Sequence, residues 1–308
     1  MTVQQLSLGI EWPQAISETE VQLPMAVSRV YVPPVKCQGI KTRLVPFILS
    51  SIRWNGHGRW IEPFVGSGVV AFNLAPPRAL LAETNVHLIT LYHDIASGVV
   101  TAESVREHLR REGRRLAQRG EEHYYEVRSR FNANPSSLDF IFLNRSCFNG
   151  VIRFNKKGQF NVPFGKKRAR FRPAYVTKIA NQVAYLSNLI SARDWVFQVS
   201  DWRETLDHVQ PGDFVYVDPP YIGRHTDYYD RWTEDDASEL FRRLLEIPAG
   251  FALSTWKENK YRRNPHLDTN LPGVTIKTMR HFYYVGSTED LRNEMEEALV
   301  IRNGFAAA

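Results

Sequence analysis

The segment Asp218-Pro219-Pro220-Tyr221 brings a carboxylate, a backbone carbonyl and an aromatic ring together, directly after the apolar run Phe214–Val217. This run predicts a buried strand, and ligands of open α/β sheets bind at the carboxyl ends of the strands. The Asp218 carboxylate and the Pro219 carbonyl both accept hydrogen bonds, so together they can bind the two hydrogens of an amino group. The alternative interpretation is a proline turn in which Asp218 is a plain cap.

A second segment, Glu62-Pro63-Phe64-Val65-Gly66-Ser67-Gly68, lies where a predicted strand at 59–64 runs into a glycine turn before an apolar helix at 69–74. Glycines at 66 and 68 allow the backbone to bend sharply and to approach a ligand closely. Glu83 ends the next predicted strand, 79–82, where a carboxylate commonly accepts hydrogen bonds from ribose hydroxyls. Together they predict an adenosine-containing cofactor. A nicotinamide nucleotide, S-adenosylmethionine and a glycine turn without a ligand all stay open at this point.

The acceptor pair at Asp218 and Pro219 suits methylation of an exocyclic amine such as that of adenine. Such an amine is a poor nucleophile because its lone pair is delocalised into the ring. Acceptors on both hydrogens favour a tetrahedral nitrogen whose lone pair is aimed at a methyl donor. Tyr221 can stack on a base that has left the double helix.

Residues 141–172 contain nine basic side chains and no acidic one, although the net charge of the whole chain is only +6. The pattern from Val151 to Val162 predicts a β-hairpin with Lys157-Gly158 at its turn. Arginine can pair with guanine and asparagine with adenine, while lysine binds phosphates of any sequence. The segment therefore favours double-stranded DNA as partner over a merely solvated basic face.

The rest of the chain alternates predicted helices, at 41–52, 101–131, 173–189 and 233–245, with predicted strands at 195–199, 251–254, 273–278 and 299–301. This alternation predicts one α/β domain with a Rossmann-like mixed sheet, split by an insertion. Residues 1–32 are expected to be an N-terminal extension, with a strand near 27–32. Residues 33–95 and 190–308 are expected to form the cofactor-binding catalytic domain, and residues 96–189 the DNA-recognition domain.

Composition narrows the remaining choices. The chain has 308 residues and two cysteines, which lie far apart and form no Cys-x-x-Cys pair. Neither a disulfide framework nor a metal site is therefore expected. No uninterrupted apolar stretch is long enough to cross a membrane, so we expect a cytoplasmic protein without membrane contact.

Over residues 33–301 the chain resembles the Dam-like family of DNA N6-adenine methyltransferases. The matching segments are Lys36-Cys37-Gln38-Gly39-Ile40-Lys41, Glu62 to Gly68, Glu83-Thr84-Asn85, Ser200-Asp201-Trp202 and Asp218 to Tyr221. Cys37 and Ile40 depart from the aromatic residue and the glycine that are usual there, and Trp202 replaces a phenylalanine. The resemblance implies a class I methyltransferase sheet with an inserted helical and β-hairpin domain that recognises the DNA target.

The resemblance also implies which residues bind S-adenosylmethionine and DNA. The residues expected at the cofactor are Cys37, Gly39, Lys41, Glu62, Pro63, Phe64, Gly66, Ser67, Gly68, Glu83, Thr84, Asn85, Asp201, Trp202 and Asp218, and the catalytic residues are Asp218, Pro219, Pro220 and Tyr221. The DNA-reading hairpin is matched by the segments at 144–150 and 160–165. By the same resemblance, Phe148 is expected near the gap that the flipped base leaves in the stack. The residues expected to face bases are Asn149, Val151, Arg153 and Pro163. The residues expected beside phosphates are Asn155, Asn161 and Lys166. Arg145, Lys156, Lys157, Lys167 and Arg168 complete the expected DNA contacts.

Three other functions stay open. An N4-cytosine methyltransferase uses the same geometry but more often has serine at the position of Asp218. An RNA or protein-glutamine methyltransferase commonly has asparagine there and lacks this hairpin. A DNA-binding regulator without catalysis would not need the segment from Asp218 to Tyr221. We expect a monomer or weak dimer, with a cognate restriction endonuclease as partner if the chain serves a restriction system. The sequence does not name the target site.

Overall fold

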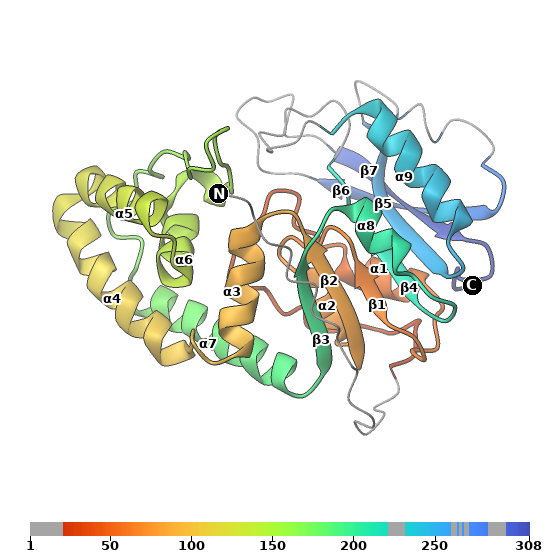
Figure 1. Cartoon of the computed structure of the whole chain (residues 1–308), viewed down its shortest axis with the longest axis horizontal. Coiled ribbons are helices and arrows are strands. Elements are labelled where there is room, and N and C mark those ends of the chain that lie inside the picture. The colour runs from red at the N-terminus through yellow and green to blue at the C-terminus, as the bar shows by residue number, and fades with distance from the viewer. Residues whose placement is uncertain (1–20, 221–231, 260–263, 265–266, 268–270, 283–293) are drawn as a thin grey trace, which may run out of the picture.

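The computed structural model describes residues 21–220, 232–259, 264, 267, 271–282 and 294–308. It shows an α/β body built around one sheet and, beside it, a helical lobe that comprises residues 102–191 (Figure 1). No helix among the described residues is both long and apolar enough to span a bilayer.

The sheet has the strand order β3-β2-β1-β4-β5-β7-β6. The bounds are β1 Trp60–Glu62, β2 Arg78–Glu83, β3 Asp194–Val199, β4 Phe214–Val217, β5 Gly250–Asn259, β6 Val274–Phe282 and β7 Glu294–Arg302. The first five strands pair in parallel, whereas β7 is antiparallel to both β5 and β6. This arrangement confirms the predicted α/β fold with a Rossmann-like mixed sheet. It also brings the carboxyl ends of β1, β2 and β4 to one edge.

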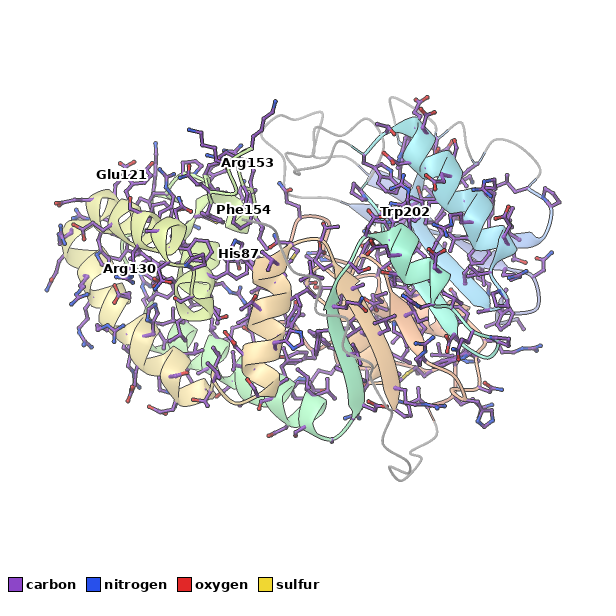
Figure 2. All side chains as sticks on the ribbon, in the orientation of Figure 1. His87, Glu121, Arg130, Arg153, Phe154 and Trp202 are labelled. Carbon is purple, nitrogen blue, oxygen red and sulfur yellow. The ribbon has the colours of Figure 1, made fainter. Side chains whose placement is uncertain are left out.

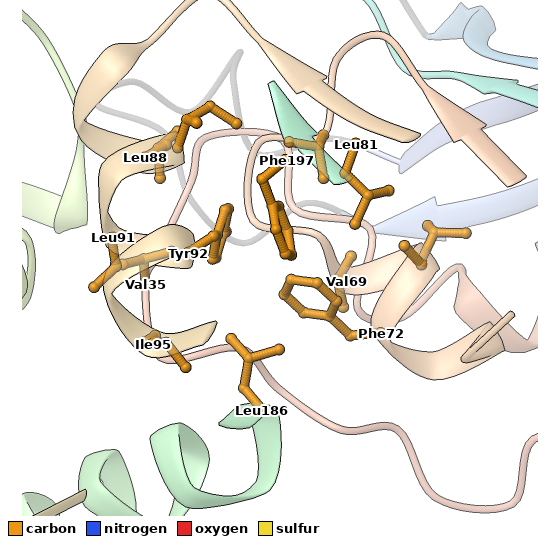
Figure 3. Packing of buried hydrophobic residues seen from close by; sticks show 14 of the residues in the cluster. Val35, Val69, Phe72, Leu81, Leu88, Leu91, Tyr92, Ile95, Leu186 and Phe197 are labelled. Carbon is orange, nitrogen blue, oxygen red and sulfur yellow. The ribbon is translucent and has the colours of Figure 1, made fainter. Parts of the chain in front are cut away.

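Alternating residues of the strands feed two hydrophobic cores on opposite faces of the sheet. Trp60 of β1 packs with α2 (Val69–Leu74) and α3 (Val86–Ala96), while its neighbour Ile61 belongs to the core on the other face. Figure 3 shows part of the first core, where Phe72, Tyr92 and Phe197 interlock. The second core is covered by α8 (Trp202–Asp207) and α9 (Glu234–Glu246). The short α1 (Val45–Ser51) packs into the first core.

The helical lobe contains α4 (Ala102–Arg119), α5 (Glu121–Ala133), α6 (Ser137–Ser146) and α7 (Pro173–Ser191). The prediction of one helix over 101–131 was wrong, because the chain breaks at Gly120. The backbone there has φ 61° and ψ −126°, a conformation that favours glycine. An added Cβ would also lie 2.7 Å from the Arg168 side chain. The break lets α5 turn back across α4 (Figure 1).

Several other boundaries differ from the prediction. Helices α3, α6 and α8 were not expected from the sequence, and the stretch 27–32 forms no strand. The helix expected over 41–52 begins only at Val45. By contrast, α2 and β4 have the predicted bounds, and Thr233 caps α9 by accepting a hydrogen bond from Asp236 N–H at 3.1 Å. The domain boundaries at 32, 95 and 189 stay a prediction.

Candidate active site

Three carboxylates gather where neighbouring parallel strands end. Glu62 is the last residue of β1, Glu83 is the last residue of β2, and Asp218 directly follows β4. Because β1 pairs with both β2 and β4, the sequence-distant side chains share one edge of the sheet. The strand order reverses at this point of the sheet, which is where open α/β sheets bind their ligands.

Lys41 forms an ion pair with Asp218. Its Nζ lies 2.8 Å from Asp218 Oδ1 and donates to the Gly39 carbonyl at 3.0 Å. The Lys41 side chain is 3% exposed and that of Asp218 22%. Burial raises the pKa of Asp218, and the Lys41 ammonium opposes this rise by favouring the charged form. Lys41 thus holds in place a carboxylate that still reaches the surface of the site.

Glu62 lies deeper than Asp218. It accepts a hydrogen bond from Trp60 Nε1–H at 2.7 Å, and its side chain is buried. Burial raises the pKa of Glu62 to about 8, although the hydrogen bonds from Trp60 and from the Ala71 backbone act against the rise. Because the N-cap residue of α2, Gly68, has no side chain, Glu62 supplies an acceptor to the first turn of that helix. The structure therefore places Glu62 under the glycine loop as a support.

The loop from Pro63 to Gly68 has the backbone that its glycines predict. Gly66 has φ 47° and Gly68 has φ 68°. A Cβ added at Gly68 would lie 2.3 Å from the Phe72 ring, whereas one added at Gly66 would meet no atom within 4 Å. Gly68 is thus required for packing, and the space beside Gly66 suits the close approach of a ligand. Tyr92 OH donates to the Gly66 carbonyl at 2.8 Å and fixes the loop from below.

Glu83 connects the glycine loop to the start of α3. Its carboxylate accepts from Gly66 N–H at 3.1 Å, from Asn85 N–H at 3.2 Å and from Thr84 Oγ1–H at 3.3 Å. Burial raises the pKa of Glu83, and these donors act against that rise. A carboxylate at a strand end beside an open glycine loop fits the ribose of an adenosine-containing cofactor.

Asp201 and Trp202 follow β3 at the same edge of the sheet. Asp201 caps α8 by accepting from Arg203 N–H at 2.8 Å, and its side chain is 42% exposed. Trp202 is only 3% exposed. Arg203 covers its ring at 4.3 Å, and Trp232 packs edge-on at 6.1 Å. Trp202, which is expected at the cofactor, is therefore part of the hydrophobic core, and its contact with the cofactor stays a prediction.

Further residues predicted at the site differ in their exposure. Pro219 and Pro220 lie half-exposed at the end of β4, and Tyr221 lies outside the described residues. Cys37 is half-buried, and burial raises the pKa of its thiol, which keeps it neutral. Ser67 is buried in the glycine loop. None of these positions tests a cofactor contact.

The expected DNA contact by Arg145 needs correction. Arg145 is buried, and its guanidinium donates to the carbonyls of Pro33 and Pro34 and to Gln182 Oε1 at 3.1 Å. All of these acceptors belong to the protein interior. Arg145 therefore joins the chain before α1 to the helical lobe, and its burial keeps it from the surface on which a phosphate would bind.

The predicted hairpin from Val151 to Val162 is present in a shorter form. A single antiparallel bridge joins Phe154 to Phe160, and Asn155 Oδ1 accepts from the backbone N–H groups of Lys157 and Gln159. The turn comprises Asn155 to Gly158, closed by Gly158 N–H donating to the Asn155 carbonyl at 2.9 Å, so it includes the predicted Lys157-Gly158 but centres on Lys156 and Lys157. The two arms also share backbone hydrogen bonds from Asn155 N–H to Gln159 and from Asn161 N–H to Arg153, at 2.9 and 3.1 Å.

The surface around this turn carries the remaining predicted DNA residues. Arg153 Nε donates to Asn161 Oδ1 at 2.8 Å, which presents the two side chains as a unit. Phe148 is 51% exposed, a rare state for a large aromatic side chain. The exposed residues there are Phe148, Asn149, Lys156, Lys157, Pro163, Lys166, Lys167 and Arg168, while Val151, Arg153, Asn155 and Asn161 are half-buried. Arg168 also donates to the Gln118 carbonyl at 2.6 Å.

The sequence prediction missed two residues that connect these regions. Lys36 was only part of a motif, but its backbone N–H donates to Asn144 Oδ1 at 2.8 Å, and its side chain lies over Gly150. Burial lowers the pKa of Lys36, as do the neighbouring guanidinium groups of Arg170 and Arg145. His87 carried no signal at all, although its ring stacks on Phe154. A basic residue beside the hairpin could have been found from the motif, but an aromatic contact between distant segments could not.

Fold and site together define a Rossmann-like α/β protein with three carboxylates and a glycine loop at one edge of its sheet. Residues 38–278 match the family described as D12 class N6 adenine-specific DNA methyltransferase, and the chain belongs to that family.

Curated relatives agree with this assignment. The chain is 35% identical over 190 residues to the retron Ec67 DNA adenine methylase of Escherichia coli. The matched region covers 59% of this chain and 62% of that protein. It is 31% identical over 243 residues to the type II methyltransferase M.MjaIII of Methanocaldococcus jannaschii, with coverages of 72% and 81%. Against the solved rRNA methyltransferase aviRa from Streptomyces viridochromogenes the TM-score is 0.36 at 12% identity, with 84% of each chain covered.

Proposed function

We propose that this chain transfers a methyl group from S-adenosylmethionine to N6 of an adenine that has been flipped out of double-stranded DNA. The observation that carries the proposal is the Lys41–Asp218 ion pair, set 2.8 Å apart at the strand edge that also holds the glycine loop and Glu83. Family membership supports adenine in DNA as the acceptor.

The chemistry assigned to this chain is the positioning of an amine. Asp218, ionised beside Lys41, accepts one hydrogen of N6, and the Pro219 carbonyl accepts the other. The nitrogen lone pair is then aimed at the methyl group, and transfer is direct and in line. Proximity and the two fixed acceptors supply most of the acceleration. The amine proton leaves to solvent after the transfer, so the site needs no strong base.

S-adenosylmethionine supplies an electrophilic methyl group on a sulfonium when it is bound. Glu83 would accept from its ribose hydroxyls, and the open side of Gly66 would face it. Asp201, at 42% exposure, is available as a second acceptor.

We further propose that the insertion at 96–189 recognises the DNA. The turn at Lys156 and Lys157 offers two exposed cations for phosphates, and Phe148 offers an exposed ring to the base stack. Arg153, paired with Asn161, belongs to the same segment and offers a guanidinium to a base. A cognate restriction endonuclease is a natural partner, because a relative is named a type II methyltransferase.

The test is Asp218→Ala, with Asp207→Ala as the matched control. Asp207 is 62% exposed and pairs with Arg243, away from the site. Incubation with tritiated S-adenosylmethionine and unmethylated duplex DNA should label N6-methyladenine after digestion to nucleosides. We expect Asp218→Ala to lower turnover at least about a hundredfold with DNA and cofactor binding retained, and the control to resemble the wild type. Near wild-type turnover in Asp218→Ala would refute the role of Asp218.

The same digest separates the alternatives. Label in N4-methylcytosine would show that the acceptor is cytosine and not adenine. DNA binding without any label in the wild type would leave a non-catalytic regulator.

A further inference from the structure

His87 lies between the residues that are proposed to bind the cofactor and the turn that is proposed to read the DNA. It occupies the first turn of α3, directly after the segment Glu83-Thr84-Asn85. Asn85 Oδ1 caps this helix and accepts from the backbone N–H of His87 at 3.0 Å and of Leu88 at 3.4 Å. Because Asn85 N–H donates to Glu83, the position of His87 is tied to the carboxylate proposed to hold the ribose.

The ring of His87 reaches the DNA-reading turn. It stacks on Phe154 with ring centroids 4.8 Å apart and an interplanar angle of 19°. Phe131 flanks it at 4.9 Å, and Phe140 lies at 6.1 Å. Figure 2 shows Arg153, Phe154 and His87 one below the other beside α3. Partial burial lowers the pKa of His87, so the neutral imidazole acts as an aromatic ring at pH 7.

Phe154 in turn fixes the base of the turn. It forms the bridge to Phe160 and packs edge-on against that ring at 5.6 Å. Its chain neighbour Arg153 is paired with Asn161 by Nε–H···Oδ1 at 2.8 Å. A displacement of Phe154 therefore moves the side chains that face the DNA bases under the proposed function.

We propose that His87 is a positioning residue that couples cofactor binding to DNA recognition. The inference rests on the proposed function. A ribose hydroxyl that donates to Glu83 would join Gly66, Thr84 and Asn85 on one carboxylate, and under this proposal the added donor shifts Asn85 and with it the cap of α3. The stacked ring passes that change to Phe154 and the turn. Coupling of two binding equilibria is reciprocal, so DNA must affect cofactor affinity by the same factor.

The experiment measures both binding equilibria. S-adenosylhomocysteine, which cannot donate a methyl group, serves as the cofactor probe. The DNA probe is an unmethylated duplex whose sequence the wild type is found to methylate. Fluorescence anisotropy gives the Kd for DNA with and without S-adenosylhomocysteine. Calorimetry gives the Kd for S-adenosylhomocysteine with and without DNA. We expect the wild type to show a coupling of about two- to tenfold, the range that one aromatic pair can supply.

His87→Ala should abolish the coupling while each Kd for a single ligand changes less than about twofold, and His87→Phe should retain it because the stacked ring is kept. The matched control is His93→Ala, which removes an exposed histidine from the same helix. Phe154→Leu removes the other ring of the stacked pair and takes the place of His87→Ala if that variant does not fold. A merely structural role would lower the melting temperature without changing the ratio of the Kd values.

The outcomes separate this inference from the proposed function. A wild type that methylates adenine but shows no coupling, or a His87→Ala variant with wild-type coupling, would overturn the role of His87 alone. A wild type that labels no adenine in DNA would overturn the proposed function.

Discussion

Lys41 and Asp218 are held together at the end of β4, with Nζ 2.8 Å from Oδ1. They come from distant parts of the chain, and the turn before α1 brings the lysine across the sheet edge. Burial alone would favour a protonated Asp218, which could no longer accept at both oxygens. The lysine therefore preserves the acceptor on which the proposed chemistry depends.

Loss of the lysine should make the reaction sensitive to acid. Because burial raises the folded pKa of Asp218 and Lys41 opposes this, Lys41→Met should raise it further. Activity requires the carboxylate, so it falls as pH falls through that pKa. We expect the acid limb of the kcat/KM profile to shift to higher pH by about one to three units.

The measurement is methyl transfer across pH 5 to 9 (about the range in which such a limb is visible), with Lys178→Met as the control. Lys178 is exposed on α7, away from the site. An unchanged acid limb in Lys41→Met would show that Asp218 does not need the ammonium to remain ionised.

Glu83 should matter for the cofactor and not for DNA. Glu83→Gln removes the charge that accepts from Gly66 and Asn85, so ribose hydroxyls lose a charged acceptor. A hydrogen bond to a charged group contributes about 1.5–3 kcal/mol, which predicts a loss of about ten- to a hundredfold in affinity for S-adenosylhomocysteine by calorimetry. The exposed Glu103→Gln is the matched control. Equal losses for DNA and cofactor would indicate local unfolding instead.

Arg145 and Lys157 should separate structural from DNA-binding cations. Each phosphate contact adds about one unit to the slope of log K against log salt concentration. Lys157→Ala removes an exposed cation at the turn, so we expect a slope smaller by about one unit. Arg145→Met should leave the slope unchanged and lower the melting temperature, because it leaves the Pro33 and Pro34 carbonyls without donors. A smaller slope in Arg145→Met would restore the original DNA prediction.

Local patterns predicted the elements that position the site. The apolar run Phe214–Val217, the glycines at 66 and 68 and the cap Thr233 each have a local physical cause, and the structure has them at these positions. The edge that unites Glu83 with Asp218 follows from parallel pairing, which alternation of helices and strands implies.

What the sequence could not show depends on contacts between distant segments. Arg145 looks like a DNA contact within a basic stretch, but the prolyl carbonyls that occupy it come from before α1. Trp202 is expected at the cofactor, but the sequence does not show that Arg203 and Trp232 pack on its ring. The approach of Arg168 to Gly120 likewise joins segments that are far apart in the sequence. A residue's type sets what it can do, and its tertiary neighbours decide whether it is free to do so.

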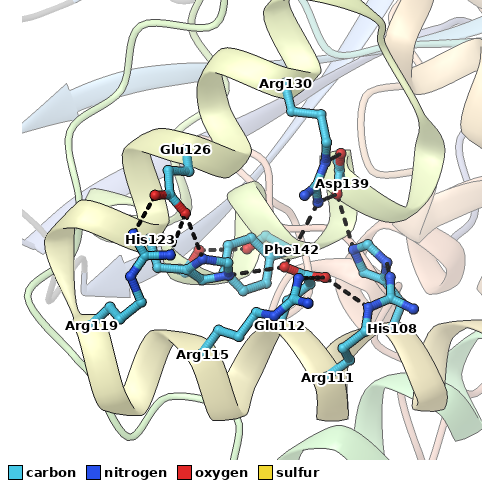
Figure 4. A network of polar contacts seen from close by, with 11 residues as sticks. His108, Arg111, Glu112, Arg115, Arg119, His123, Glu126, Arg130, Asp139 and Phe142 are labelled. Atoms are coloured by element: carbon cyan, nitrogen blue, oxygen red, sulfur yellow. Dashed lines mark hydrogen bonds and ion pairs between the residues drawn. The ribbon is translucent and has the colours of Figure 1, made fainter.

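The helical lobe should owe part of its stability to a buried ionic network. Figure 4 shows Asp139 accepting from Arg130 Nε–H at 2.8 Å, with His108 Nε2 at 3.1 Å. Arg130 also lies 3.8 Å from Glu112, which is buried between the helices. Burial acts to raise the pKa of Asp139, but the hydrogen bonds from Arg130 and His108 outweigh it and lower the pKa to about 2.

A lowered folded pKa means that Asp139 stabilises the fold at every pH above its unfolded value, and that this stability is lost as pH falls through the folded value. The span from 3.8 to about 2 corresponds to about 2 kcal/mol. Asp139→Asn should therefore lower the free energy of unfolding in urea at pH 7 by at least about 2 kcal/mol, and by less at pH 3. The exposed Glu103→Gln should change it by less than about 0.5 kcal/mol at either pH. A loss for Asp139→Asn that is the same at both pH values would mean that its charge does not stabilise the lobe, and that only the shape of its hydrogen bonds does.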